Sequence, residues 1–470
     1  MKNTKRRFVL FSFYDRSGIE TYLEQQAESG WLLDKVSAFG WRFRRIEPRK
    51  IRFSVVYFSK ASAFDPEPSE QQLVFQDFCE HTGWKIASSN AQMQIFYNDR
   101  ADPTPIETDA VLEVAAIHAA VKKSFLPNYC LLAAAGMMNA ALFVWRLLSD
   151  PVGVLASNAS LFTGLCCALM LILSLTEIIG YYRWHKRAQA AAELDGSFTE
   201  TKGHTNLQAL ILCVLLAAFA LFLISCSGSK MSLIALSSVA VVMGITAIIV
   251  GISQLMKKMR LSAGVNRTAT IILTIVLAFG FSGLLFIAVS SNINSFRPEK
   301  APAETYTYKG YTQNIYHDEL PLTIEDLMDT EYDGYSYAIR TRDESLLIAR
   351  WEAVQRPRMD ALDQPELEYT VTTVKVPLLY DWCKNALLQD FAHHYGHPVP
   401  EDDLWEKHVA VDPAPWKARE AYQLWLGGEP DMRFLLCYDG CMVEIDFSNG
   451  WELTAEQMGL VAEKLSPAKS

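Results

Sequence analysis

The stretch LQALILCVLLAAFALFLISC, residues Leu207–Cys226, decides the fold, because no charged residue interrupts it. A helix needs roughly 20 apolar residues to cross a hydrocarbon core of about 30 Å, and this stretch has that length. Apolar side chains would surround such a helix without a polar stripe, which favours lipid over a globular core as its surroundings. The stretch therefore predicts a transmembrane helix.

Four further stretches have the same character, and the only charges inside them, Arg146 and Glu177, lie near helix ends. Five buried helices of one large soluble domain are the alternative, but they would leave almost no polar surface in this part of the chain. We predict membrane helices near residues 126–148, 161–181, 207–226, 231–252 and 268–290.

The charge is distributed unevenly along the 470 residues, which are 50% hydrophobic and carry a net charge of −10. Lys and Arg counted against Asp and Glu give +1 for residues 1–125, +6 for 126–300 and −17 for 301–470. The composition excludes a disordered chain. We predict α+β soluble domains at residues 1–121 and 296–470, joined by an all-α membrane region at 122–295.

Basic residues near the membrane helices predict the orientation of the chain, because cytoplasmic loops are enriched in Lys and Arg. Basic segments precede the first helix and follow the second and fourth, and the intervening loops carry at most one Lys. This pattern places the N-terminus in the cytoplasm and, after five crossings, the C-terminus outside the cell membrane. The apolar stretch Phe8–Tyr14 is too short for a signal peptide and is better interpreted as a strand.

The N-terminal domain contains an internal repeat. Each half predicts a strand, a helix and two further strands, and each helix ends in Gly-Trp, at Gly30-Trp31 and Gly83-Trp84. Gly is expected there because the residue after a helix often has positive φ. Two βαββ units would form a single sheet with both helices on one face.

Several short motifs in this domain resemble a known family: Phe13-Tyr14-Asp15, Gly30-Trp31-Leu32-Leu33, Trp41-Arg42-Phe43 and Gly83-Trp84-Lys85. They are similar to those of an uncharacterised bacterial family of multi-pass membrane proteins, whose N-terminal domain is called domain of unknown function 2812. The resemblance covers roughly residues 5–125. It implies a bacterial membrane protein with a cytoplasmic protein partner or transcriptional regulator, and it supplies no catalytic residue.

A basic surface is predicted on the strand that begins at Trp41 and on the segment that follows it. Arg42 and Arg44 alternate with Trp41 and Phe43, and Lys50 and Arg52 follow them. Such a face contacts anionic lipid headgroups or an acidic partner, or is an ordinary solvated strand face, the commonest case. Direct nucleic-acid binding is not expected, because the domain is nearly neutral and has no recognised nucleic-acid motif.

Polar residues within the predicted membrane helices are candidates for function. Glu177 lies near the cytoplasmic end of the second helix, and Asn139 lies near the middle of the first. Pairing or snorkelling at the interface is the more ordinary explanation of Glu177, and helix–helix contact is that of Asn139. The two residues are nevertheless retained as a candidate intramembrane polar site. Gly164 and Gly280 suit close helix contact.

The C-terminal domain is predicted to combine an antiparallel sheet with helices. Asp439-Gly440 between two apolar runs is typical of a two-residue hairpin turn, which would put Cys437 and Cys441 on opposite faces. A longer turn would let them form a disulfide. His393 and His397 have the i, i+4 spacing of a shared metal site, but the nearby Gly396 and Pro398 indicate a helix end instead.

No catalytic motif or cofactor-binding motif is present, so we predict neither a catalytic residue nor a cofactor. A non-enzymatic sensor or adaptor coupling the two soluble domains is the leading hypothesis. A transport or resistance component, working in the lipid bilayer, is the alternative. An extracellular hydrolase would require a metal ion at His393 and His397.

Overall fold

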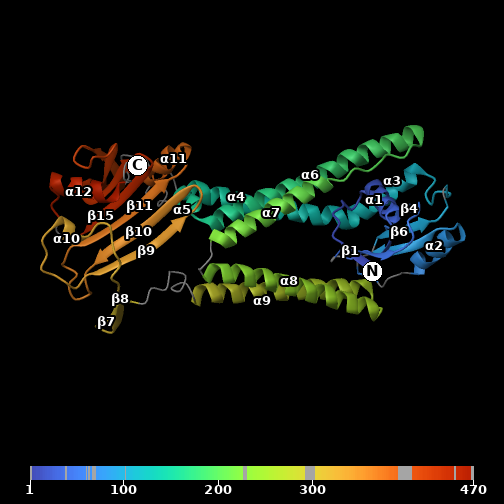
Figure 1. Cartoon of the computed structure of the whole chain (residues 1–470), viewed down its shortest axis with the longest axis horizontal. Helices are drawn as coiled ribbons and strands as arrows, with labels where there is room; N and C mark the ends of the chain where they lie inside the picture. Colours follow the sequence, from blue (N-terminus) through green and yellow to red (C-terminus); the bar gives the residue numbers. More distant parts are fainter. Residues whose placement is uncertain are drawn as a thin grey trace. The chain divides into compact units, whose positions relative to one another are not determined.

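The computed structural model describes residues 3–37, 40–59, 61, 64–65, 70–90, 92–100, 102–225, 230–291, 302–389, 405–448 and 451–466. The chain divides into two compact units. The first comprises residues 1–140 and 166–290, and the second residues 141–165 and 291–470. Figure 1 shows the elements of each unit.

Five helices among the described residues are long and apolar enough to cross a membrane, as the sequence predicts. The first runs from α3 through a π-helical segment, Val121–Phe125, into α4. Exposed Leu, Val and Ile side chains cover most of their surfaces, which suits a lipid environment. The elements are α3 (Ala110–Ala120), α4 (Leu126–Ser149), α6 (Asn158–Asp195), α7 (Thr205–Ser225), α8 (Lys230–Lys258) and α9 (Ala263–Ser291).

The N-terminal domain is a duplicated βαββ unit, which confirms the repeat. The strand orders β1-β3-β2 and β4-β6-β5 are equivalent in the two halves. Gly30 and Gly83 have φ values of +82° and +89°, as expected after each helix. The elements are β1 (Thr4–Arg7), α1 (Arg16–Glu28), β2 (Trp31–Lys35), β3 (Trp41–Arg45), β4 (Arg52–Tyr57), α2 (Glu70–His81), β5 (Lys85–Asn90) and β6 (Met93–Asn98).

Two expectations about this domain are wrong. The halves form two three-stranded sheets rather than one, because β2 and β5 meet through a side chain: the Val36 amide donates to Ser88 Oγ at 3.0 Å. The segment Phe8–Tyr14 is not a strand, since β1 ends at Arg7. Its last residue, Tyr14, is fully buried and packs on Trp184 instead of joining a sheet.

The core of the first unit combines the N-terminal domain with membrane helices. Apolar side chains of α1 and both sheets pack together with α3 and the second half of α6. From α6 the core takes Tyr181, Trp184, Ala188 and Ala192. The domain is therefore packed on these helices rather than tethered to them by a linker.

The C-terminal domain is built on a seven-stranded antiparallel sheet in the order β12-β13-β14-β15-β11-β10-β9. A separate hairpin precedes the sheet, and the helical segments are α10 (Ile324–Leu327), η3 (Pro377–Leu379), α11 (Tyr380–Gln389) and α12 (Ala455–Leu465). The strands are β7 (Glu304–Tyr308), β8 (Tyr311–Ile315), β9 (Ser336–Glu344), β10 (Ile348–Arg356), β11 (Glu366–Val374), β12 (Glu406–Val411), β13 (Glu420–Leu426), β14 (Glu429–Tyr438) and β15 (Cys441–Ser448).

The two faces of this sheet are covered differently. On one face, α10 and α12 pack on the larger core. On the other face, α11 and α5 (Pro151–Ala156), the short helix between α4 and α6, cover one end of the sheet (Figure 1). Val152, Leu155 and Ala156 of α5 are buried there. The loop between the first two membrane helices is thus part of the C-terminal domain's core.

Candidate functional site

A buried polar cluster, here called the polar junction, connects the start of α1 to α6, α7 and the loop between them. Its members are polar residues that are remote in sequence and meet by hydrogen bonds, which His204 makes through its backbone amide. They are Ser12, Asp15, Ser17, Glu177, Thr201, His204 and Gln208.

Thr201 fixes the α6–α7 loop to the first turn of α1. The Ser17 amide donates to Thr201 Oγ1 at 2.8 Å, and the Thr201 amide donates to Ser17 Oγ at 3.2 Å. Thr201 Oγ1 also donates to Asp15 Oδ1 at 3.3 Å. Three hydrogen bonds therefore join one loop residue to the N-terminus of a helix.

Asp15 caps α1 from a buried position, with 4% of its surface exposed. Its carboxylate accepts from the Gly18 amide at 3.2 Å, one of the amides that a helix start leaves without a partner. Burial raises the pKa of Asp15, and the hydrogen bonds from Gly18, Gly203 and Thr201 oppose that rise. Gly203 packs so closely on this carboxylate that a Cβ atom there would collide with it.

Glu177 is fully buried and accepts a hydrogen bond from Gln208 Nε2 at 2.7 Å. His204 Nδ1 lies 4.0 Å from the same carboxylate oxygen. Gln208 also donates to Ser12 Oγ at 3.4 Å, so it connects the membrane helix to the segment before α1. The geometry suits a structural connection between elements.

Asn139, the second predicted intramembrane residue, makes a local contact. Its Nδ2 donates to the carbonyl of Ala135 in the preceding turn at 2.8 Å, and its side chain is exposed. Glu177 and Asn139 have no common partner among the hydrogen bonds of the described residues. Gly164 makes the close helix contact expected of it, against the ring of Phe143 in α4, whereas Gly280 makes no such contact with another element among the described residues.

The basic surface of the N-terminal domain is larger than its sequence indicates. Arg42 and Arg44 are exposed on β3, and β1 places Arg6 directly opposite Arg42. Lys35 of β2 is opposite Arg42 on the other side, so cations follow one another across three strands. Asp34 compensates one of them through an ion pair with Arg42 at 2.5 Å. Like charges placed opposite each other destabilise a sheet, so this row of cations is unfavourable for the sheet by itself.

The other two predicted basic residues lie next to this row in sequence. Arg52 forms an ion pair with Glu24 at 3.3 Å, and Lys50 is exposed. Binding of an anionic surface by Arg42, Arg44, Lys50 and Arg52 stays a prediction. The contribution of β1 was missed because Thr4–Arg7 alone has no strand pattern.

A cavity of about 310 Å³ lies between α3 and the end of α6. Two histidines on its wall, His118 and His185, stack with ring centroids 4.2 Å apart. His118 Nδ1 is 2.6 Å from the hydroxyl of Tyr181. Gln189 and Glu193 add polar groups to walls that are otherwise formed by small apolar residues.

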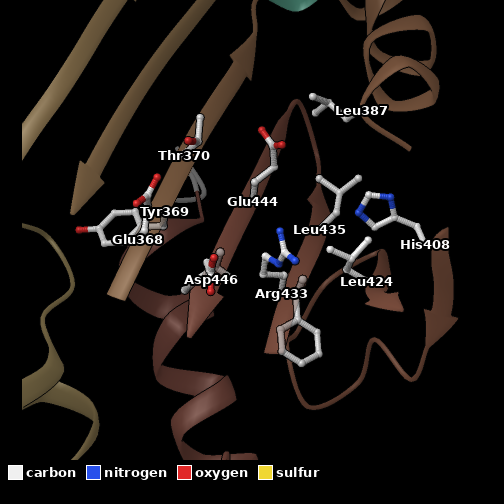
Figure 2. A pocket seen from close by; sticks show the side chains of 12 residues that line it. Glu368, Tyr369, Thr370, Leu387, His408, Leu424, Arg433, Leu435, Glu444 and Asp446 are labelled. Atoms are coloured by element: carbon white, nitrogen blue, oxygen red, sulfur yellow. The ribbon is translucent and has the colours of Figure 1, made fainter. Parts of the chain in front are cut away.

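The C-terminal sheet carries a second cavity, of about 210 Å³, on the face that bears α11. Figure 2 shows acidic side chains of neighbouring strands beside Arg433, with His408 on an outer strand. Burial raises the pKa values of Glu368 and Asp446. Two arginines compensate Glu368: Arg340 pairs with it at 3.1 Å and Arg356 at 2.8 Å. The cavity offers mixed polar and apolar walls to a small molecule.

The predicted metal pair, His393 and His397, lies outside the described residues. Among the residues that are described, no group of three or more His, Cys, Asp or Glu side chains is arranged to hold a metal ion. Cys437 and Cys441 are free thiols on opposite sheet faces, because Tyr438 pairs with Cys441 across a two-residue turn.

The polar junction could not be found from the sequence. Asp15 before Ser17 is a recognisable helix start, but its bond to Thr201 spans 186 positions and leaves no periodic signal. Gln208 is one polar residue at the start of an apolar stretch. Such pairings become visible only once the helices are packed.

Comparison with known proteins bears on the N-terminal part alone. Residues 15–127 match the model of a family described as Protein of unknown function (DUF2812). No curated protein and no solved structure matches the chain. The matched range begins at Asp15 of the polar junction and ends just inside α4, so it covers most of the duplicated domain together with α3. The N-terminal domain of this multi-pass membrane protein is a DUF2812 domain.

Proposed function

We propose that this chain is a non-enzymatic sensor or adaptor of a bacterial cell membrane, coupling an extracellular C-terminal domain to a cytoplasmic N-terminal domain. One observation carries the proposal: membrane helices or their connecting loop enter the core of each soluble domain. In the second unit, α5 is buried against the sheet. In the first, the end of α6 is buried within the N-terminal domain.

The coupling element is α6. It is one helix, Asn158–Asp195, whose first residue donates to the Glu344 carbonyl at 2.6 Å. Its later residues Tyr181 and Trp184 belong to the other core. Small shifts of a packed helix are a known way to transmit a conformational change, since a packed core adopts discrete arrangements. Gln208 and Thr201 would pass such a shift to the start of α1.

The orientation follows from the basic loops, which favour a cytoplasmic N-terminus. The partner that we propose on that side is a cytoplasmic protein, such as a transcriptional regulator, and not nucleic acid itself. Arg6, Arg42 and Lys35 form a cationic row that would suit an acidic protein surface. The lipid bilayer is the second partner.

Hydrogen exchange of the full-length protein in lipid nanodiscs tests the coupling. Leu155→Ala removes a buried side chain of α5, and Val461→Ala removes a buried side chain of α12 on the opposite face of the sheet. Leu155→Ala should raise exchange at residues 12–20 and 198–204 of the first unit. Val461→Ala, the control, should raise exchange only in the C-terminal domain. Equal behaviour of the two variants, with no change outside that domain, would contradict the proposal.

A further inference from the structure

Two leucine side chains of the C-terminal domain are almost fully exposed. Leu346 is 83% exposed and Leu378 is 91% exposed, more than any other large apolar side chain in the described part of the chain. A single exposed leucine needs no explanation. These two, however, belong to the same end of one sheet, so their exposure calls for a common cause.

The sheet register brings them together. Leu346 lies in the turn between β9 and β10, and Leu378 lies in η3, directly after β11. The first residue of β10, Ile348, pairs with the last residue of β11, Val374. The amide of Lys375 donates to the carbonyl of Leu347 at 2.8 Å and closes this end of the sheet.

The same end is attached to α5. Ser345 Oγ donates to the carbonyl of Leu155 at 2.6 Å, and Asn158 Nδ2 donates to the carbonyl of Glu344 at 2.6 Å. Because α5 is a six-residue helix between two candidate membrane spans, it has to lie at the membrane surface. Leu346 is the next residue after Ser345, so it lies at that surface too.

The final turns of α4 indicate that this end of the sheet lies at the membrane surface. Trp145 is 65% exposed and Leu148 is 63% exposed, and both belong to the compact unit that contains α5 and the C-terminal sheet. Exposed tryptophans are typical of the boundary between hydrocarbon and headgroups. The apolar end of the sheet is therefore continuous with a lipid-facing helix surface.

We propose that this end of the C-terminal domain rests on the bilayer, with Leu346 and Leu378 inserted at the boundary between headgroups and acyl chains. The contact is apolar rather than electrostatic. Lys375, the cation beside it, is held by Glu344 Oε1 and by the carbonyl of Ser345, each at 2.7 Å. The occupant is lipid, and contact with anionic headgroups is not required.

Site-specific photocrosslinking tests the proposal on the full-length chain in nanodiscs of phosphatidylcholine. Benzoylphenylalanine is introduced in place of Leu346, Leu378 or, as a control, Leu362. Leu362 is 65% exposed in the loop between β10 and β11, at the opposite end of the same strands. The proposal expects lipid adducts at Leu346 and Leu378, at least fivefold above those at Leu362, identified by the added lipid mass.

Repeating the experiment with added phosphatidylglycerol should leave the adduct yield unchanged. Equal yields at all three positions would overturn the proposal. Crosslinking to a second copy of the chain in place of lipid would overturn it too, as would a yield that rises with the anionic lipid fraction. Both substituted leucines are highly exposed, so the variants should fold, and the two positions report independently.

Discussion

Asp15 combines two roles that usually belong to different residues. It caps α1 through the Gly18 amide, and it accepts from Thr201 in the α6–α7 loop. The first role can be predicted from an acidic residue before a helix. The second depends on burial, and burial also raises the pKa of Asp15.

The raised pKa of Asp15 gives a pH dependence with a definite sign. A buried acid with a raised pKa contributes stability below the pKa of the unfolded chain, and that stability is lost as the pH rises through the folded value. Replacing Asp15 with Asn removes this titration. Relative to the wild type, Asp15→Asn should therefore gain stability as the pH rises from about 4, the ordinary pKa of an aspartate, measured by thermal unfolding in detergent. A constant difference between the two proteins as the pH rises would contradict the prediction.

Thr201→Val should destabilise the first unit by about 1–3 kcal/mol, because it removes the acceptor of the Ser17 amide and one of the hydrogen bonds to the Asp15 carboxylate while keeping the side-chain volume. Thr163→Val is the control, since Thr163 Oγ1 only donates to the Ala159 carbonyl of its own helix and is exposed. Urea unfolding monitored by tryptophan fluorescence would measure both variants. A loss as large for Thr163→Val would show that the junction has no special role.

At the scale of elements, the βαββ repeat was predictable because each half carries its own periodicity and its own Gly-Trp ending. The break between the two sheets was not predictable from the sequence. It depends on Ser88, whose hydroxyl takes the Val36 amide where a strand pairing would otherwise continue. The segment Phe8–Tyr14 is apolar enough for a strand, but Tyr14 packs on Tyr181 and Trp184 of α6, a tertiary effect that overrides local propensity.

The edge of β4 is protected by α1. Glu20 Oε1 accepts the Val55 amide at 2.8 Å, so the carboxylate takes the place of a neighbouring strand. Arg16 pairs with Glu20 at 2.8 Å and with Glu113 of α3, and holds the carboxylate in position.

We expect Glu20→Ala to cost about 1–3 kcal/mol and to promote aggregation, because it exposes an unpaired strand amide. Glu28→Ala, at the exposed end of the same helix, is the matched control. Size-exclusion chromatography and thermal unfolding of the detergent-solubilised protein would compare them. An unchanged elution profile and melting temperature for Glu20→Ala would show that the hydrogen bond from the Val55 amide to Glu20 does not protect the edge of β4.

At the scale of the whole molecule, the sequence predicted most of the architecture because lipid imposes strong requirements on composition. A membrane helix needs about 20 apolar residues, and each of the five satisfies this requirement by itself. The docking of α5 on the C-terminal sheet was not predictable. Leu155, Ile348 and Cys437 are unremarkable apolar residues in sequence, and only the folded sheet brings them together.

We propose that the two soluble domains lie on opposite sides of a membrane that the chain crosses five times. Reporters fused after Ser470 test it in intact bacterial cells, with insertions at Gly196, directly after α6, as the internal reference. Alkaline phosphatase should be active after Ser470 and inactive at Gly196, and green fluorescent protein should show the reverse. Fluorescence of the fusion after Ser470, with inactive phosphatase at the same position, would place both domains on one side and contradict five crossings.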